Sequence, residues 1–173
     1  MEDNRFEVRE VTQDDIDELR PVFNECIRDR ETGEVIEDEV DEDLKLIERV
    51  ARGEETDKRY YVASIGGRVV GGMGFKTKLD EAVRSYAKTD NPMEVVMAYV
   101  STQARGSGAG RALLRRIEED ARKMGFLELL VNSGPRYVES GWGFYDRTIG
   151  GKLGFLANYY GEGANAALWR EDL

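Results

Sequence analysis

The chain has 173 residues, a formal net charge of −10 and a charged fraction of 35%, and this composition excludes several classes of protein. The length suits one domain with one hydrophobic core, so we expect residues 1–173 to form a single domain. An acidic surface argues against nucleic acid or an anionic membrane as a partner, since both attract basic patches. The absence of histidine excludes histidine triads, proton shuttles and histidine metal sites, and we expect no bound metal.

The location of the protein follows from what the sequence lacks. No stretch is apolar over a membrane-spanning length and no signal peptide is evident, so we expect a cytoplasmic protein. Its single cysteine, Cys26, cannot form an internal disulfide. Cys26 falls on the apolar side of a predicted helix, and we interpret it as a core residue because no histidine is available to activate it.

The first third of the chain is predicted to form a strand and two helices. Residues 5–11 alternate apolar and charged side chains, as a half-buried strand does. Helical spacing then runs to about residue 28, where Pro21 is expected to kink or split the helix. An acidic loop at 29–40 precedes a second amphipathic helix that ends near Gly53.

The middle of the chain is predicted to form a hairpin and a helical excursion. Strands at 60–65 and 68–75 are joined by the two-residue turn Gly66-Gly67. Three glycines at 71, 72 and 74 would weaken the second strand unless another group packs closely against them. Residues 76–93 show helical spacing and end in a stop signal at Asp90-Asn91-Pro92.

A loop of alternating glycines dominates the second half of the chain. It follows the apolar strand 94–100, carries glycine at 106, 108 and 110, and leads into an amphipathic helix over 110–124. Such a loop lets backbone N–H groups approach a ligand, and the helix adds its unpaired N–H groups and the positive end of its dipole. We therefore predict a binding site for an anion, most naturally phosphate. A parallel strand at 126–131, a short helical turn and two further strands complete the chain.

Two familiar phosphate-binding patterns do not fit this loop. A Walker-type loop requires Gly-Lys-Ser or Gly-Lys-Thr, which is missing, and the dinucleotide pattern Gly-x-Gly-x-x-Gly lacks its third glycine. A third pattern fits: Arg105-Gly-Ser-Gly108-Ala-Gly110, followed by two leucines, resembles the Arg/Gln-x-x-Gly-x-Gly/Ala motif of the GNAT superfamily of acyl-CoA N-acyltransferases. A shifted alignment that begins at Gln103 also matches the motif, but it places the two leucines less well.

The order of predicted elements along the whole chain also resembles this superfamily. The resemblance implies an α/β (α+β) fold with a mixed central sheet of about six to seven strands, flanked by helices, in which the fourth and fifth strands splay apart. It further implies acetyl-CoA as co-substrate, a primary amine on a small molecule or peptide as acceptor, direct transfer in a ternary complex, and a homodimer as the family-like assembly.

The same resemblance assigns residues to the coenzyme. The loop amides would hold the pyrophosphate, and an amide near Met97 to Tyr99 would face the thioester oxygen. Asn132 would bind the pantetheine or, alternatively, cap the next helix, and the two arginines would contact phosphate or remain solvated. The predicted coenzyme residues are Tyr99, Val100, Arg105, Gly106, Ser107, Gly108, Ala109, Gly110, Arg111 and Asn132.

The catalytic candidates are an acid on the central strand and a tyrosine. Glu94, eleven residues before Arg105, is spaced like the base glutamate of the histone-acetylating branch, and burial would suit it to accept a proton near neutral pH. The alternative is a strand-end glutamate that points to water. Tyr137-x-x-x-Gly141-Trp142 resembles the family's Tyr-x-x-x-Gly-Phe, whose tyrosine reaches the coenzyme sulfur. Tyr145 is the substitute acid, and packing is the alternative role for either tyrosine.

The acceptor itself stays open at this point. Tyr86, Trp142 and Tyr145 are the predicted acceptor-binding residues, although such aromatic residues pack in cores more often than they bind substrate. The segment 76–93 is interpreted either as a cover over the acceptor pocket or as a surface excursion. Two other functions stay open: an acyl-CoA-binding or sensing protein without catalysis, and an acyltransferase that uses a longer acyl-CoA.

Overall fold

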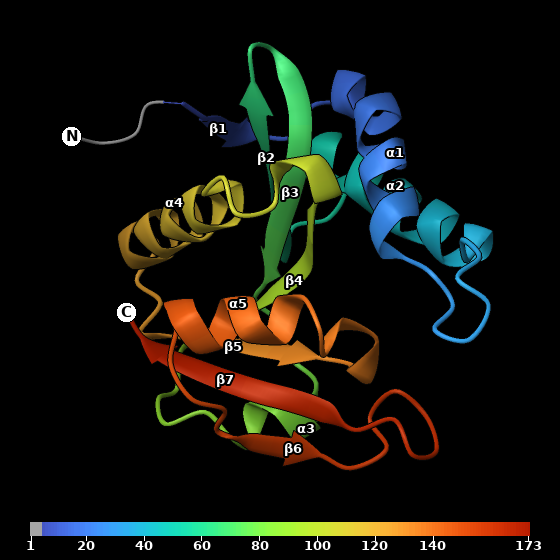
Figure 1. Cartoon of the computed structure of the whole chain (residues 1–173). Coiled ribbons are helices and arrows are strands. Elements are labelled where there is room, and N and C mark those ends of the chain that lie inside the picture. Colours follow the sequence, from blue (N-terminus) through green and yellow to red (C-terminus); the bar gives the residue numbers. More distant parts are fainter. Residues whose placement is uncertain (1–4) are drawn as a thin grey trace. The chain divides into compact units, whose positions relative to one another are not determined.

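The computed structural model describes residues 5–173, so residues 1–4 of the predicted domain lie outside the described part (Figure 1). The strands are β1 Glu7–Glu10, β2 Lys58–Ile65, β3 Arg68–Lys76, β4 Pro92–Val100, β5 Glu128–Ser133, β6 Gly154–Leu156 and β7 Ala166–Asp172. The helices are α1 Ile16–Cys26, α2 Glu37–Ala51, α3 Glu81–Arg84, α4 Ala109–Lys123 and α5 Gly141–Thr148, with 3-10 turns at Gln13–Asp15, Thr102–Ala104 and Pro135–Tyr137.

The strands form a seven-stranded mixed sheet in the order β1-β2-β3-β4-β5-β7-β6. β4 stands at its centre and pairs in parallel with β5, from Pro92 opposite Glu128 to Val95 opposite Val131. β1 pairs antiparallel with β2, and β7 pairs antiparallel with both β5 and β6. The predicted fold class, an α/β chain with a mixed sheet flanked by helices, is confirmed.

The chain divides into two compact units by its internal contacts. The first unit contains the chain up to Phe75 together with Val96–Ile117, and the second contains Lys76–Val95 together with Glu118–Leu173. The chain passes from one unit to the other at the end of β3, within β4 and within α4.

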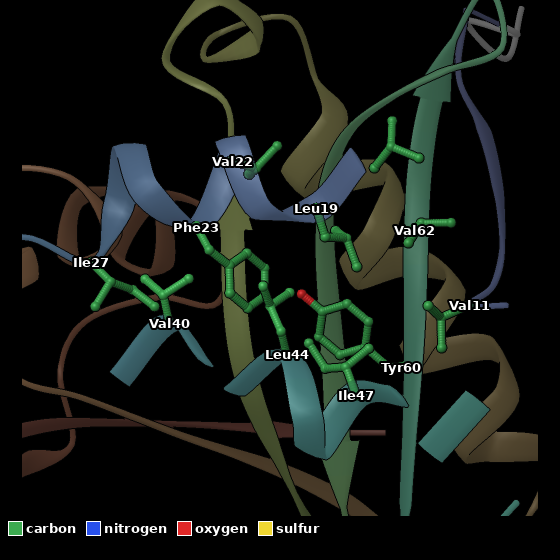
Figure 2. Packing of buried hydrophobic residues seen from close by; sticks show 11 residues of the cluster. Val11, Leu19, Val22, Phe23, Ile27, Val40, Leu44, Ile47, Tyr60 and Val62 are labelled. Carbon is green, nitrogen blue, oxygen red and sulfur yellow. The ribbon is translucent and has the colours of Figure 1, made fainter. Parts of the chain in front are cut away.

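A hydrophobic cluster between two helices and the strands forms the core of the first unit (Figure 2). Leu19 and Phe23 of α1 and Leu44 and Ile47 of α2 point toward the strands and are at most 2% exposed. Burial of each such side chain contributes about 1.5–3 kcal/mol. The apolar spacing of both helices therefore serves this core, as the sequence predicted.

The first helix keeps its proline without being split. α1 is continuous from Ile16 to Cys26 with Pro21 inside it, so the predicted split is wrong. Pro21 is exposed, which lets water satisfy the carbonyl that loses its helical partner. The helix follows a 3-10 turn whose buried Asp15 accepts hydrogen bonds from the Arg9 guanidinium and the Thr12 amide, each at 2.7 Å.

Close packing explains the glycines of β3. A Cβ atom on Gly72 would lie 2.5 Å from the Tyr60 ring, and one on Gly74 would lie 2.7 Å from the same ring. A Cβ atom on Gly71 would lie 2.9 Å from the Tyr99 carbonyl oxygen. The prediction that another group packs against these glycines is confirmed, because the Tyr60 ring lies directly over two of them.

The second unit has a smaller cluster of its own. Val83, Leu130 and Leu168 are buried, and Tyr86 and Tyr159 pack against them. The segment predicted to be helical over 76–93 forms only one helical turn, α3, whose Val83 enters this cluster. Within residues 5–173 no helix is both long and apolar enough to span a membrane.

Candidate functional site

The glycine loop lies between β4 and α4, as predicted. Gly106 has a φ of 74° and Gly108 a φ of 101°, a left-handed conformation that residues with side chains rarely adopt. Nothing lies within 4 Å of a Cβ placed on Gly106, so the backbone conformation rather than crowding requires glycine there. Ala112 N–H donates to the Gly108 carbonyl at 2.9 Å, so the N–H groups of residues 109–111 precede the first helical bonds. These groups and the helix dipole have the character that a bound anion requires, as the sequence predicts.

A glutamate that the sequence did not single out anchors this loop to α1. The Glu25 carboxylate accepts hydrogen bonds from the Thr102 amide at 2.6 Å and the Thr102 hydroxyl at 2.8 Å. The Ser101 hydroxyl donates to it at 3.2 Å. Burial opposes ionisation of Glu25, but these hydrogen bonds outweigh it and lower the pKa of the carboxyl. Glu25 is one of several acids along α1, so no sequence pattern sets it apart.

The predicted arginines differ in their surroundings. Arg105 is exposed, and its Nη2 lies 3.7 Å from the Cys26 sulfur. Arg111 is exposed on the first turn of α4.

Burial raises the pKa of the Cys26 thiol, which makes it a poor nucleophile and agrees with a packing role.

β4 is distorted at the position expected to face a thioester. Met97 has a φ of 49° in the middle of the strand, a conformation that costs on the order of 1–3 kcal/mol for a residue with a side chain. The buried Tyr60 hydroxyl donates to the Met97 carbonyl at 2.9 Å. A left-handed residue turns the neighbouring peptide groups out of the regular strand pattern, and residues 96–100 are only partly buried. The side chain of Tyr99 packs edge-on against Phe23 at 4.7 Å, so a role toward a ligand would fall to its backbone.

Glu94 is the buried member of a polar group in the second unit. Its side chain is 2% exposed, and its Oε2 lies 3.3 Å from the Nζ atom of Lys76, the last residue of β3. Asn132 lies on β5, two residues beyond the partner of Glu94, and its Nδ2 donates to Glu94 Oε1. Burial raises the pKa of Glu94, and the Lys76 ammonium opposes that rise. Glu94 therefore does not point to water, and the strand-end alternative is wrong.

Three further residues complete this polar group. Lys76 Nζ lies 3.8 Å from Asp80 Oδ2, and the Tyr159 hydroxyl donates to the same Asp80 oxygen. The Tyr160 hydroxyl donates to Asn132 Oδ1. The sequence singled out neither Lys76 nor Asp80. Their neighbours become visible only when the strands are paired.

Asn132 differs from its prediction. It lies inside β5, opposite Leu168, rather than beyond the strand. The 3-10 turn that follows has Gly134 at its N-cap, so the alternative that Asn132 caps the next helix is wrong. Both polar side-chain atoms of Asn132 bind protein groups: Nδ2 binds Glu94 and Oδ1 binds Tyr160.

The predicted aromatic residues fall mostly into packing positions. Tyr145 is 6% exposed and packs against Trp169 at 5.2 Å, and burial raises the pKa of its hydroxyl. The Trp142 indole N–H donates to the Gly134 carbonyl at 3.0 Å, and its ring lies 6.2 Å from that of Trp169. Tyr86 packs against the core cluster of the second unit.

Tyr137 retains a partly exposed position. It ends the 3-10 turn Pro135–Tyr137, and a separate helix, α5, begins four residues later at Gly141. The Arg136 guanidinium lies 5.8 Å from the centre of its ring, and Arg136 Nη1 lies 3.4 Å from its hydroxyl.

Within residues 5–173, no three histidine, cysteine or acidic side chains are grouped as a metal site would require.

Most of the chain, including the loop between β4 and α4, matches a known family. A family model described as the acetyltransferase (GNAT) family matches residues 16–150, well over half of the chain. The chain belongs to this family. The resemblance to the GNAT superfamily is thereby confirmed, and the chain is an acetyltransferase by family.

Solved structures share the GNAT fold across almost the whole chain. A GNAT-family protein from Desulfovibrio desulfuricans superposes with a TM-score of 0.75 at 17% identity, covering 96% of this chain and 98% of that one. The PaiA N-acetyltransferase from Thermoplasma acidophilum, solved in complex with coenzyme A, has a TM-score of 0.68 at 19% identity over 97% and 99% of the two chains. The ribosomal-protein-alanine N-acetyltransferase from Brucella melitensis has a TM-score of 0.68 at 21% identity over 96% and 99%. Among curated protein sequences, none matches this chain.

Proposed function

We propose that this GNAT-family chain transfers an acetyl group from acetyl-CoA to a primary amine directly, in a ternary complex, and that residues 1–173 act as one catalytic domain. The observation that carries the proposal is the backbone at Gly106 and Gly108 ahead of α4, whose N–H groups suit a diphosphate. Family membership and a structural neighbour bound to coenzyme A support the same cofactor.

The residues fit the coenzyme by their chemistry. The N–H groups of residues 106 and 108–111 would hold the pyrophosphate, since the Ser107 N–H donates to the Ala104 carbonyl, and Arg105 and Arg111 would supply positive charge. Glu25 is no obstacle to an anion at this loop, because its carboxylate already accepts hydrogen bonds from Ser101 and Thr102. The distorted backbone at Met97 supports the proposal that a β4 amide faces the thioester oxygen.

The chemistry divides among a base, an amide donor and an acid. Bound acetyl-CoA supplies the acetyl group as a thioester. Glu94 accepts one proton from the acceptor ammonium, and the free amine forms the new N–C bond while the C–S bond breaks. Tyr137 is proposed to deliver a proton to the departing sulfur, and the second proton that the nitrogen loses as the amide forms replaces it on the tyrosine. Its partial exposure favours it over Tyr145, which is buried against Trp169. The acidic chain favours a cationic acceptor.

Calorimetric titration with acetyl-CoA and, separately, with CoA tests whether the glycine loop binds the coenzyme. We expect saturable binding of both, which Gly108→Glu abolishes because a carboxylate then occupies the anion site and the backbone is strained at φ 101°. Gly53→Glu is the matched control, since Gly53 has a φ of 75° and open space beside it but lies at the end of α2. Unchanged affinity of Gly108→Glu for CoA would contradict the proposal that this loop binds the coenzyme.

A screen of primary amines by thiol release then tests catalysis. Polyamines, aminoglycosides, amino acids and peptides with free N-termini cover the acceptor classes. Thiol release with at least one of them, faster with acetyl-CoA than with succinyl-CoA, is the expected result. Binding without turnover on any amine would favour the sensing function, and a preference for succinyl-CoA would favour a longer acyl donor.

A further inference from the structure

Each oxygen of the Glu94 carboxylate has a different partner. Oε1 accepts a hydrogen bond from the Asn132 amide. Oε2 is buried, lacks a well-aligned hydrogen bond, and lies 3.3 Å from the Lys76 ammonium. The two side chains are 2% and 19% exposed, so water screens this ion pair weakly. Lys76 is therefore the cation that compensates the charge of Oε2.

The other groups that face Glu94 do not supply positive charge. Asp80 shares Lys76 with Glu94, at 3.8 Å from the ammonium, and its negative charge disfavours ionisation of Glu94. Tyr159 donates to Asp80 and faces Glu94 as a neutral hydroxyl, while Tyr160 binds Asn132. A carboxylate buried among neutral groups and a second acid would otherwise take up a proton, because desolvation favours the neutral form.

We propose that Lys76 is a positioning residue of the transfer reaction, which holds the Glu94 carboxylate in the ionised form that accepts the acceptor's proton. This inference rests on the proposed role of Glu94 as base. Lys76 acts through Glu94 and needs no contact with the acceptor. Asp80 has the opposite effect, because it competes for the Lys76 ammonium and repels a negative charge on Glu94.

The protonation of Glu94 can be measured without any substrate. The side-chain carboxyl carbons of glutamate are labelled with ¹³C, and the Glu94 signal is assigned by its loss in Glu94→Gln. Its chemical shift is then followed against pH in the full-length protein and in four variants. Lys76→Met removes the charge, Lys76→Arg keeps it, and Asp80→Asn removes the competing acid. Lys78→Met is the matched control, because it removes the same charge from an exposed site two residues away.

We expect the Glu94 titration midpoint to move to higher pH by about one pH unit or more in Lys76→Met. Lys76→Arg restores the wild-type midpoint, and Lys78→Met leaves it in place. Asp80→Asn moves it to lower pH by a smaller amount, because Asp80 is 59% exposed. These opposite shifts distinguish a charge effect from a general loss of structure. If Lys76→Met fails to fold, as judged by circular dichroism, the downward shift in Asp80→Asn and the retained midpoint in Lys76→Arg remain as tests.

An unchanged midpoint in Lys76→Met, or an equal shift in Lys78→Met, overturns the role of Lys76. The pH profile of kcat/KM separates this result from failure of the proposed function. If its acid limb moves with the Glu94 midpoint, both inferences are supported. If the midpoint moves but the acid limb does not, Lys76 still controls the Glu94 carboxylate, and Glu94 is not the base.

Discussion

Glu94 shows how one residue acquires its chemistry from its surroundings. It is the one acid in the strand Pro92–Val100, and a carboxyl there is costly to bury without partners. The protein supplies an amide from β5 and an ammonium from the end of β3. The balance leaves the pKa of Glu94 above its ordinary value, since burial outweighs the opposing charge of Lys76. A base of this kind loses activity as the pH falls through that raised value.

The variant Glu94→Gln tests this role. We expect kcat/KM to fall by about 10²–10⁴-fold at pH values above the pKa of Glu94 and below that of the acceptor ammonium. Below the pKa of Glu94 the wild-type base is itself protonated, so the loss shrinks there. At high pH the free amine needs no base, so the loss shrinks. The measurement is a pH profile of kcat/KM for wild type and variant, with the exposed Glu119→Gln as control. A profile with the wild-type acid limb would rule out Glu94 as base.

At the scale of an element, β3 shows why a strand tolerates so many glycines. Its residues Gly72 and Gly74 make room for the Tyr60 ring of the neighbouring strand. The same ring carries the hydroxyl that binds the carbonyl of Met97. Glycines that look unfavourable in a strand thus leave space for Tyr60, whose hydroxyl binds the distorted part of β4.

The variant Gly72→Ala is expected to destabilise the protein by about 1–3 kcal/mol, because its Cβ would overlap the buried Tyr60 ring. Urea denaturation followed by circular dichroism gives the free energy of unfolding. Gly151→Ala is the matched control, since it has nothing within 4 Å of its Cβ, and its effect should be near zero. Equal stability of Gly72→Ala and wild type would mean that Tyr60 can move aside at little cost.

At the scale of the whole molecule, the two compact units share elements. β4 contributes Pro92–Val95 to one unit and Val96–Val100 to the other, and α4 is divided after Ile117. A helix or strand that melts in one unit loses its continuation in the other. This sharing supports the proposal that residues 1–173 form one catalytic domain.

Differential scanning calorimetry tests that proposal. We expect one transition whose calorimetric enthalpy equals the van't Hoff enthalpy, as for a two-state domain. Acetyl-CoA should raise the midpoint of the single transition, because a ligand that binds only the folded state stabilises it. Two separate transitions, of which acetyl-CoA shifts only one, would show that the units unfold independently.

The sequence alone determined the features that depend on local patterns. Periodicity placed the helices and strands, the glycines at 106 and 108 located the loop proposed to bind an anion, and Glu94 stood out as the acid of an apolar strand. Each of these follows from residues a few positions apart, where side-chain spacing and backbone conformation carry the information. Element ends were less accurate, as the single turn of α3 shows.

The tertiary structure decided which residues surround Glu94. Lys76 and Asp80 come from one segment of the chain, Asn132 from a second and Tyr160 from a third, and these segments meet through strand pairing and loop packing. The left-handed conformation of Met97 and its contact with Tyr60 likewise depend on neighbouring strands. No local pattern encodes such contacts, because register between strands is set by the packing of the whole sheet. The position and the left-handed glycines of the proposed cofactor loop were therefore predictable from sequence, whereas the environment that tunes the proposed base was not.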